Sequence, residues 1–184
     1  GGIDSALTAV IAKEAIGAKN VLGISMPSVF SSDHSIADAK VLAENLGIDF
    51  TIISIKEINK QILADLSSIL NGSPAGLAEE NLQARIRGNI LMAVANKREA
   101  LLLNTGNKTE TALGYCTMYG DMAGALAVIS DLNKSTVYAL SKWINEHYNN
   151  EVIPESSISK APSAELKPNQ IDPFDYEKVS PLVD

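Results

Sequence analysis

The stretch GGIDSA, residues 1–6, decides how the rest of the sequence is interpreted. Gly1 and Gly2 carry no Cβ atoms, so the backbone N–H groups beside them can approach a ligand closely. The helix predicted to follow adds unpaired N–H donors and a positive dipole end, and Ser5 adds a hydroxyl. These groups together are typical of a site for a phosphate or a pyrophosphate.

Asp4 lies within the same stretch, where its carboxylate would repel an anion unless a divalent cation lay between them. The stretch therefore predicts a nucleotide bound with magnesium. It is not a Walker A loop, because no Gly-Lys-Ser/Thr follows, and it is not the dinucleotide pattern G-x-G-x-x-G. A plain capped helix after a glycine turn is the alternative that these residues alone leave open.

Helix-like and strand-like patterns alternate along the chain beyond this stretch. Apolar spacing predicts a helix over residues 5–16 that ends at Gly17, and a buried strand over 20–26 that ends at Pro27. A second helix is predicted within SSDHSIADAKVLAENLG, residues 31–47, which opens with Ser and Asp capping candidates.

The alternation continues to about residue 148. Further predicted elements are a strand at 50–55, helices at about 57–70 and 79–98, a loop at 71–76, a strand at 100–105, a Gly-rich stretch at 114–125, a short strand at 127–129 and a helix from Asp131 or Asn133 onward. The remainder reads as a loop-rich tail. Such βαβ repetition predicts an α/β fold, a three-layer arrangement of a parallel sheet with helices on both faces.

Composition narrows the class of protein. The 184 residues suit one domain with a single core, and no domain boundary is evident. The formal charge of −7 argues against a sequence-independent nucleic-acid binder, and no apolar run approaches the ~20 residues of a membrane-spanning helix. Because Cys116 is the single cysteine, no internal disulfide can form, and a cytoplasmic location is expected.

A second polar block, LLLNTGNKTETALGYCTMYGD at residues 101–121, follows the predicted strand at 100–105. Ligands of parallel sheets gather at the carboxyl ends of the strands. There Glu110 could supply a second magnesium carboxylate, Thr105 a hydroxyl to a nucleotide, and Lys108 a positive charge. The alternative is an ordinary solvated loop.

With both blocks in view, a family resemblance becomes specific. GGIDSA resembles the pyrophosphate motif SGGxDS of the N-type ATP pyrophosphatases, without its leading serine. Within that superfamily, four ordered blocks resemble NAD synthetase, and most of all its glutamine-dependent type. The blocks are SSDHSIADAKVLAENLGI (31–48), EENLQARIRGNILMAVAN (79–96), NTGNKTETALGYCTMYGDMAG (104–124) and PSAELKPNQ (162–170).

The resemblance implies an adenine nucleotide alpha hydrolase-like, Rossmann-like fold and a ligase activity. ATP would adenylate the nicotinate carboxylate of deamido-NAD and release pyrophosphate, and ammonia would then displace AMP to give NAD. Adenylation replaces oxide, a poor leaving group, with AMP. The protein's tasks would be to hold the reactants together and to neutralise phosphate charge, with Mg²⁺ as cofactor and ATP as co-substrate.

The motifs also imply roles for individual residues. The residues that would contact the pyrophosphate portion of ATP are Gly1, Gly2, Asp4 and Ser5. Other ATP contacts fall to Thr105, Lys134 and Ser163. Mg²⁺ would be bound by Asp4 and Glu110. These two residues and Lys134 form the implied catalytic set. Deamido-NAD contacts fall to Asn81, Arg85 and Asp121.

Each of these residues also has an ordinary structural interpretation. Arg85 and Arg87 in a long helix would usually be solvated or ion-paired, and Lys134 would usually be a surface lysine. Cys116 is more typical of a small buried residue than of a nucleophile. The only histidines that could serve it as a base are His34 and His147, and neither shares a motif with it. Trp143 reads as helix packing.

The resemblance also implies partners. A homodimer is expected, formed through the helix at 79–98, with ammonia either free or delivered by an upstream glutaminase domain. The family's strand and serine before Gly1 are missing, and the tail IDPFDYEKVSPLVD follows the family only loosely. Residues 1–184 are therefore expected to be an NAD synthetase domain of the ATP-pyrophosphatase type, truncated at the N-terminus and at the C-terminus.

The sequence leaves two rival functions open. One is another ligase of the same superfamily, such as a GMP synthetase or a tRNA-modifying enzyme, in which EENLQARIRGN and YGDMAG would not be expected. The other is a non-catalytic nucleotide-binding module, which has no need of two carboxylates directed at magnesium, Asp4 and Glu110.

Overall fold

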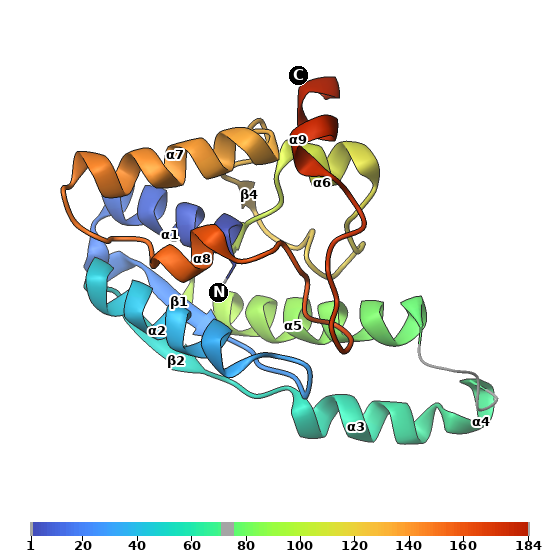
Figure 1. Ribbon diagram of the computed structural model, residues 1–184. Helices are drawn as coiled ribbons and strands as arrows, with labels where there is room; N and C mark the ends of the chain where they lie inside the picture. Colours follow the sequence, from blue (N-terminus) through green and yellow to red (C-terminus); the bar gives the residue numbers. More distant parts are fainter. Residues whose placement is uncertain (1, 71–75, 184) are drawn as a thin grey trace.

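The computed structural model describes residues 2–70 and 76–183 (Figure 1). Gly1 and most of the predicted loop at 71–76 therefore lie outside the described residues. The longer helices are α1 (Ile3–Ile16), α2 (Asp33–Leu46), α3 (Lys56–Asp65), α5 (Leu77–Arg98) and α7 (Lys134–His147). The shorter ones are α4 (Ser67–Leu70), α6 (Lys108–Leu113), α8 (Glu155–Ser159), α9 (Tyr176–Val179) and the 3-10 turns Ala18–Asn20 and Ser180–Leu182.

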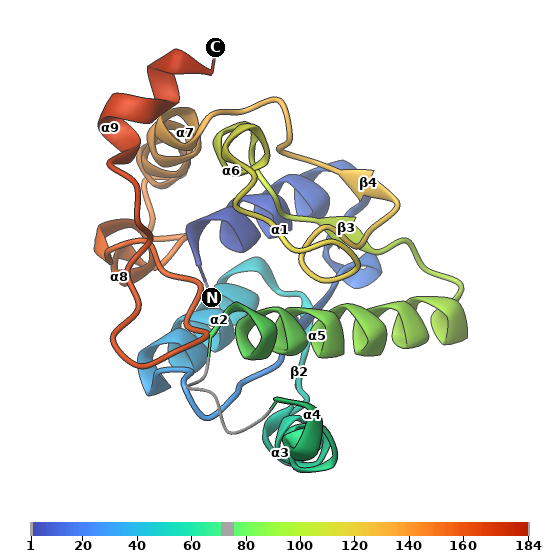
Figure 2. The same ribbon diagram turned by 90° about the vertical axis from the view of Figure 1, so that its right-hand side faces the viewer.

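The strands confirm the predicted α/β class. Strand β1 (Leu22–Ser25) runs parallel to β2 (Asp49–Ile52), and β3 (Leu103–Asn104) runs parallel to β4 (Leu126–Ala127). Among the described residues these are two separate two-stranded pairs. Helices α1, α2, α7 and α8 pack together on one side of the strands, whereas α3 and α5 pack together on the other, as Figures 1 and 2 show.

The main hydrophobic core lies within the first of these helical layers. It is formed by apolar residues of α1, α2, α7 and α8 and of the segments between them. Its buried members are Ile3, Ala6, Leu7, Val10, Leu42, Leu46, Ile129, Val137, Ile144, Val152, Ile153 and Ile158. Burial of α1 by this core fixes the direction of its first turn, on which the proposed phosphate site depends.

Side-chain caps explain where several helices begin. The Ser32 hydroxyl accepts a hydrogen bond from the Ser35 backbone N–H at 3.2 Å at the start of α2. Asn107 caps α6 and Asn133 caps α7 in the same way. Helix α1 differs, because its N-cap residue is Gly2, which has no side chain to satisfy the first amides.

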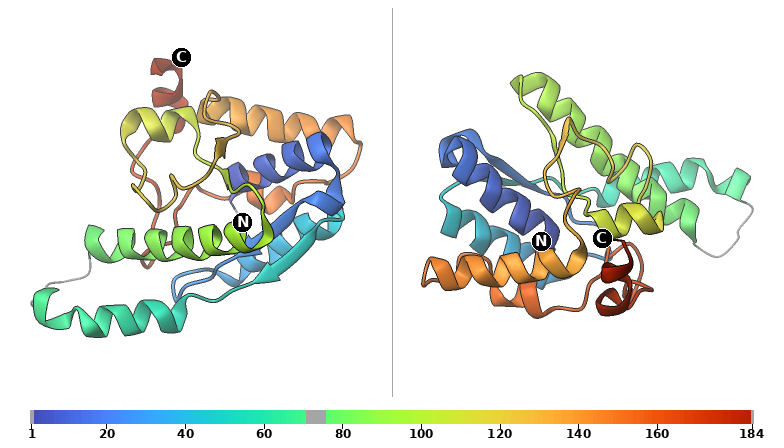
Figure 3. Two further views of the ribbon diagram at one scale, coloured as in Figure 1. Left: turned by 180° about the vertical axis from the view of Figure 1, so that it is seen from behind. Right: turned by 90° about the horizontal axis from the view of Figure 1, so that it is seen from above.

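The polar loop over residues 114–125 packs directly on α5. A Cβ atom on Gly88 would lie 2.8 Å from the Tyr119 carbonyl oxygen, and one on Gly120 would lie 2.9 Å from the Ala84 Cβ atom. Side chains at either position would force the loop away from the helix. The two glycines thus allow a close approach that fixes the position of the loop (Figure 3).

The observed elements differ from the predicted ones mainly in length. The helix predicted at 57–70 ends at Asp65, and α4 begins two residues later. Strands β3 and β4 are two residues each, shorter than predicted, because ladder length depends on the partner strand and not on local composition. Helices α8 and α9 lie in the tail predicted as loop-rich, and no element was predicted for the segment that forms α6. A helix of four to six residues has too few turns to show a period.

No helix in the described part of the chain is long and apolar enough to cross a membrane.

Candidate functional site

A cavity of about 630 Å³ opens where the first turn of α1 faces α6, α7 and the segment after α8. Among the residues that line it are several that the sequence predicted for the site: Gly2, Asp4, Thr105, Glu110, Asp121, Lys134 and Ser163. These residues come from six different segments of the chain. A cavity of this size accommodates a nucleotide-sized ligand.

One buried ammonium group joins the two carboxylates predicted to bind magnesium. Lys134 Nζ lies 2.5 Å from Asp4 Oδ2 and 3.1 Å from Glu110 Oε1. Only 3% of the Lys134 side chain is exposed, against 18% for Asp4 and 19% for Glu110. Lys134 is therefore not the surface lysine that its sequence context alone favours.

The charges of Lys134, Asp4 and Glu110 act on one another at short range. Burial lowers the pKa of Lys134, but the charges of Asp4 and Glu110 outweigh it and raise the pKa above its usual value. Burial, together with the Asp4 charge, raises the pKa of Glu110 against the opposing effect of Lys134. The ammonium thus remains charged and offsets two carboxylates that would otherwise repel each other.

Asn107 holds this group in place and was not among the residues singled out from the sequence. Its side-chain amide donates to Asp4 Oδ1 at 2.9 Å, while its side-chain oxygen accepts from the Glu110 backbone N–H at 3.0 Å. Asn107 is fully buried. The signal that could have revealed it is an Asn three positions before a Glu, a pattern typical of a helix start.

Among the described residues, the first turn of α1 has no side-chain cap for its backbone N–H groups, and Gly2, Ile3 and Asp4 of this turn line the same cavity. Gly2 is the N-cap of the helix. The Ser5 hydroxyl donates back to the Gly2 carbonyl at 2.9 Å, and Ser5 does not line the cavity. The predicted roles of Ser5 and of Gly1, which is outside the described residues, stay predictions.

The residues predicted to hold deamido-NAD surround the loop at 114–125. The Asn81 side-chain oxygen accepts from the Thr117 hydroxyl at 2.8 Å, and Arg85 Nε donates to the Met118 carbonyl at 3.2 Å. Asp121 Oδ1 accepts from the Thr117 backbone N–H at 2.7 Å. Of the predicted set, Asp121 lines the cavity, whereas Asn81 and Arg85 lie behind the loop and hold it to α5.

An aspartate that is hydrogen-bonded to two tyrosines lies at another side of the site. The sequence did not indicate this cluster. Asp172 accepts from the hydroxyls of Tyr115 at 3.0 Å and Tyr176 at 2.9 Å. The Tyr176 ring centroid lies 5.3 Å from Lys134 Nζ, within reach of a cation–π interaction. The tail predicted as a loop thus covers the buried ammonium.

The remaining candidates occupy less central positions. Cys116 lines the cavity, but burial raises the pKa of its thiol, which disfavours a thiolate nucleophile. Neither His34 nor His147 lines the cavity. His147 stacks on Trp143 with ring centroids 4.6 Å apart, and 52% of Trp143 is exposed. Lys108 also lies outside the lining, so its predicted charge at the nucleotide stays a prediction.

Comparison with known proteins identifies a protein family. A family model described as NAD synthase matches residues 1–181. The chain belongs to the NAD synthase family. Each block that carried the sequence resemblance falls within the match.

Similar proteins of the NAD synthase family are known from several bacteria. The chain is 56% identical over 172 residues to the glutamine-dependent NAD(+) synthetase of Synechocystis sp., a match that covers 94% of this chain and 30% of that protein. It is 51% identical over 181 residues to the protein of the same name from Thermotoga maritima, covering 98% and 31%. The chain thus spans about 30% of the length of these curated relatives.

Solved structures agree with this assignment. The glutamine-dependent NAD+ synthetase of Acinetobacter baumannii, solved with ADP, matches 90% of this chain and 32% of its own with a TM-score of 0.84 and 44% identity. The NMN synthetase of Francisella tularensis matches 100% of this chain and 73% of its own with a TM-score of 0.87 and 29% identity. Both support the α/β nucleotide-binding fold.

The cavity offers few protein ligands for a metal ion. Within residues 2–70 and 76–183, no three His, Cys, Asp or Glu side chains are grouped so as to hold one. Asp4 and Glu110 both line the cavity, and Lys134 Nζ contacts each of them. A pair of carboxylates fits magnesium, which usually completes its shell with waters and substrate phosphates.

Proposed function

We propose that residues 1–184 are the ATP-pyrophosphatase-type domain of an NAD synthetase, which converts deamido-NAD to NAD with ATP and ammonia. Membership of the NAD synthase family supports this assignment. The single observation that carries the chemistry is the meeting of Asp4, Glu110 and Lys134 at the first turn of α1. A mere nucleotide-binding module would not need two carboxylates in this cavity.

In this proposal the chain's own groups bind and neutralise the triphosphate. The first amides of α1 would donate to the pyrophosphate portion, and Lys134 would contribute a positive charge to it. Thr105 and Ser163 line the same cavity and would contact ATP through their hydroxyls. Asp4 and Glu110 would hold Mg²⁺, which would supply further neutralisation of phosphate charge.

Deamido-NAD would lie along the loop at 114–125, with Asp121 toward the cavity and Asn81 and Arg85 beside it. We place the homodimer interface near α5, next to this loop. Ammonia would come from an upstream glutaminase domain, since the curated relatives are named glutamine-dependent and this chain spans about 30% of their length. A cytoplasmic location belongs to the same proposal.

The decisive experiment incubates the full-length natural protein with ATP, Mg²⁺, ammonium and deamido-NAD. AMP, pyrophosphate and NAD should form in equal amounts, and omission of deamido-NAD should stop all three. Xanthosine monophosphate in place of deamido-NAD should give no product. Formation of GMP, or ATP binding without any turnover, would contradict the proposal.

A second candidate differs only in the substrate. The likeness to an NMN synthetase over the whole chain favours a test of nicotinate mononucleotide as the acid to be amidated. The identity is higher with the glutamine-dependent NAD synthetases of Synechocystis and Acinetobacter baumannii, at 56% and 44%, than with this NMN synthetase, at 29%. We therefore expect the dinucleotide to have the higher kcat/KM when the two acids compete.

A further inference from the structure

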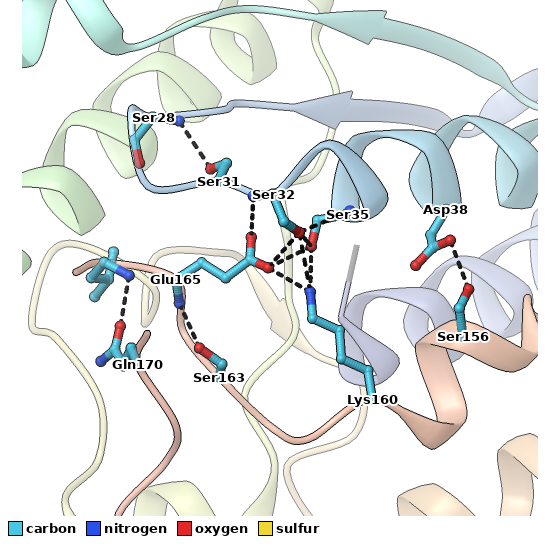
Figure 4. Close-up of polar contacts among 11 residues, drawn as sticks. Ser28, Ser31, Ser32, Ser35, Asp38, Ser156, Lys160, Ser163, Glu165 and Gln170 are labelled. Atoms are coloured by element: carbon cyan, nitrogen blue, oxygen red, sulfur yellow. Dashed lines mark hydrogen bonds and ion pairs between the residues drawn. The ribbon is translucent and has the colours of Figure 1, made fainter. Parts of the chain in front are cut away.

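Beside the proposed ATP site, the Glu165 carboxylate accepts hydrogen bonds from the distant start of α2 and from nearby Lys160 (Figure 4). Glu165 Oε1 accepts from the Ser35 hydroxyl at 2.7 Å, the Ser32 hydroxyl at 2.9 Å and Lys160 Nζ at 2.5 Å. Its other oxygen accepts from the Ser32 backbone N–H at 3.3 Å. The serines open α2, about 130 positions before Glu165 in the sequence.

The environment keeps this carboxylate ionised. Burial alone would raise the pKa of Glu165, but hydrogen bonds from Lys160, Ser35 and Ser32 outweigh it and lower the pKa below its usual value. The start of α2 contributes the positive end of a helix dipole. Charge-assisted hydrogen bonds of this kind are stronger than neutral ones, so the contact fixes its segment firmly.

The backbone at Glu165 is held in a conformation that glutamate seldom adopts. Its φ angle is 50°, in the left-handed region where a Cβ atom is disfavoured. The Glu165 backbone N–H donates to the Ser163 hydroxyl oxygen at 3.1 Å, which closes a tight turn. The side-chain contacts with α2 offset the cost of this turn.

The other end of the same segment is attached to α5. The Leu166 carbonyl accepts from Gln83 Nε2 at 2.9 Å, and Lys167 forms an ion pair with Glu80 at 3.0 Å. The segment therefore connects the start of α2 to α5, and its residues 160–165 line the cavity. Ser163 lies on the cavity side of it, together with Lys160 and Glu165.

We propose that Glu165 is a positioning residue: by seating its carboxylate on Ser32, Ser35 and Lys160, it holds residues 160–166 so that Ser163 contacts ATP. This inference rests on the proposed function, and it adds a residue whose effect on ATP passes through Ser163. It follows that the effect of Glu165 falls on ATP and not on deamido-NAD, which lies along the loop at 114–125.

The test compares Glu165→Gln and Glu165→Gly with wild type in the full-length natural protein. The Gln variant keeps the shape and removes the charge, whereas the Gly variant relaxes the left-handed turn and removes the carboxylate. Glu146→Gln, at an exposed position of α7, is the matched control. Calorimetry measures the Kd for ATP with Mg²⁺ and for deamido-NAD, and hydrogen exchange follows the amides of residues 160–168.

For both variants we expect the Kd for ATP to rise about tenfold and segment exchange to accelerate, with the Kd for deamido-NAD unchanged. An equal rise in the Kd for both ligands would indicate a general structural role and overturn the proposal. A Gly variant with wild-type ATP affinity would overturn it too, because the backbone turn and not the carboxylate would then matter.

Ser32→Gly gives an independent test that spares the cavity lining. Ser32 does not line the cavity, and glycine is nearly as good a helix N-cap as serine. A higher Kd for ATP in this variant, with faster exchange at 160–168, supports the proposal, and an unchanged Kd contradicts it. Should wild type bind ATP but make no NAD, the proposed function would fail while the exchange data still decided the role of Glu165.

Discussion

Lys134 Nζ lies 2.5 Å from Asp4 Oδ2, although 130 positions separate the two residues in the sequence. The contact joins the first turn of α1 to the first turn of α7, two helices that pack in the same layer. It places a positive charge at the point where unpaired helix amides also gather. A site that binds a highly charged phosphate group needs both features.

Replacement of Lys134 by methionine should reveal the repulsion that its ammonium now offsets. Removing one partner from a buried ion pair costs about 3 kcal/mol, so the domain should unfold at a lower urea concentration. Lys142→Met, at an exposed position of the same helix, should change the midpoint little. Equal midpoints for the two variants would show that Lys134 does not stabilise the carboxylates.

Asp4→Asn should abolish the release of pyrophosphate while the fold persists, because the change removes a metal-directed charge and preserves the shape. Glu110→Gln should behave in the same way. A pyrophosphate assay and circular dichroism of the full-length protein measure the two effects. Normal pyrophosphate release in a folded Asp4→Asn protein would rule out the proposed metal pair.

Tyr176→Phe should destabilise the domain by about 1 to 2 kcal/mol, since it deletes a hydrogen bond to the Asp172 carboxylate and keeps the ring over Lys134. Tyr119→Phe is the control, because that side chain is 81% exposed. Urea unfolding of both variants measures the difference. If the two behave alike, the contact between the tail and Asp172 contributes nothing to stability.

Arg85→Ala should weaken deamido-NAD more than ATP, because Arg85 holds the Met118 carbonyl of the loop that carries Asp121. Loss of one charge-assisted contact corresponds to about a tenfold rise in Kd. Calorimetry with each ligand separates the effects, and Arg98→Ala at the end of α5 is the control. A variant that lost ATP affinity instead would place deamido-NAD elsewhere.

The contact at Glu165 should make stability depend on pH in the acid range. Its pKa is lowered in the folded protein, so the stabilisation is fully present above the unfolded value near 4.5 and is lost as the pH falls through the lower folded value. The difference in melting temperature between wild type and Glu165→Gln should therefore shrink below about pH 4.5. A difference that stayed constant down to pH 3 would exclude this carboxylate as its source.

The sequence predicted the helices that are long enough for their apolar spacing to repeat. The helix predicted at 79–98 is observed at 77–98, and the helix predicted to start after Asp131 or Asn133 begins at Lys134, because apolar periodicity and capping residues are local signals. It also indicated Asp4, Glu110 and Lys134 through a resemblance in motif. The sequence did not indicate the roles of Asn107 and Asp172, since each depends on a contact with a distant residue, Asp4 and Tyr115 respectively.

What the sequence alone determined is therefore the class of fold and the types of group that surround the proposed phosphate site, because both follow from short-range patterns. The tertiary structure decided which groups meet: that Lys134 is buried between two carboxylates, that Arg85 holds a loop, and that Glu165 seats on α2. Such meetings depend on the packing of α1 against α2, α7 and α8. The local sequence around Lys134 is ordinary. Its burial makes its positive charge interact strongly with carboxylates from two other helices, α1 and α6.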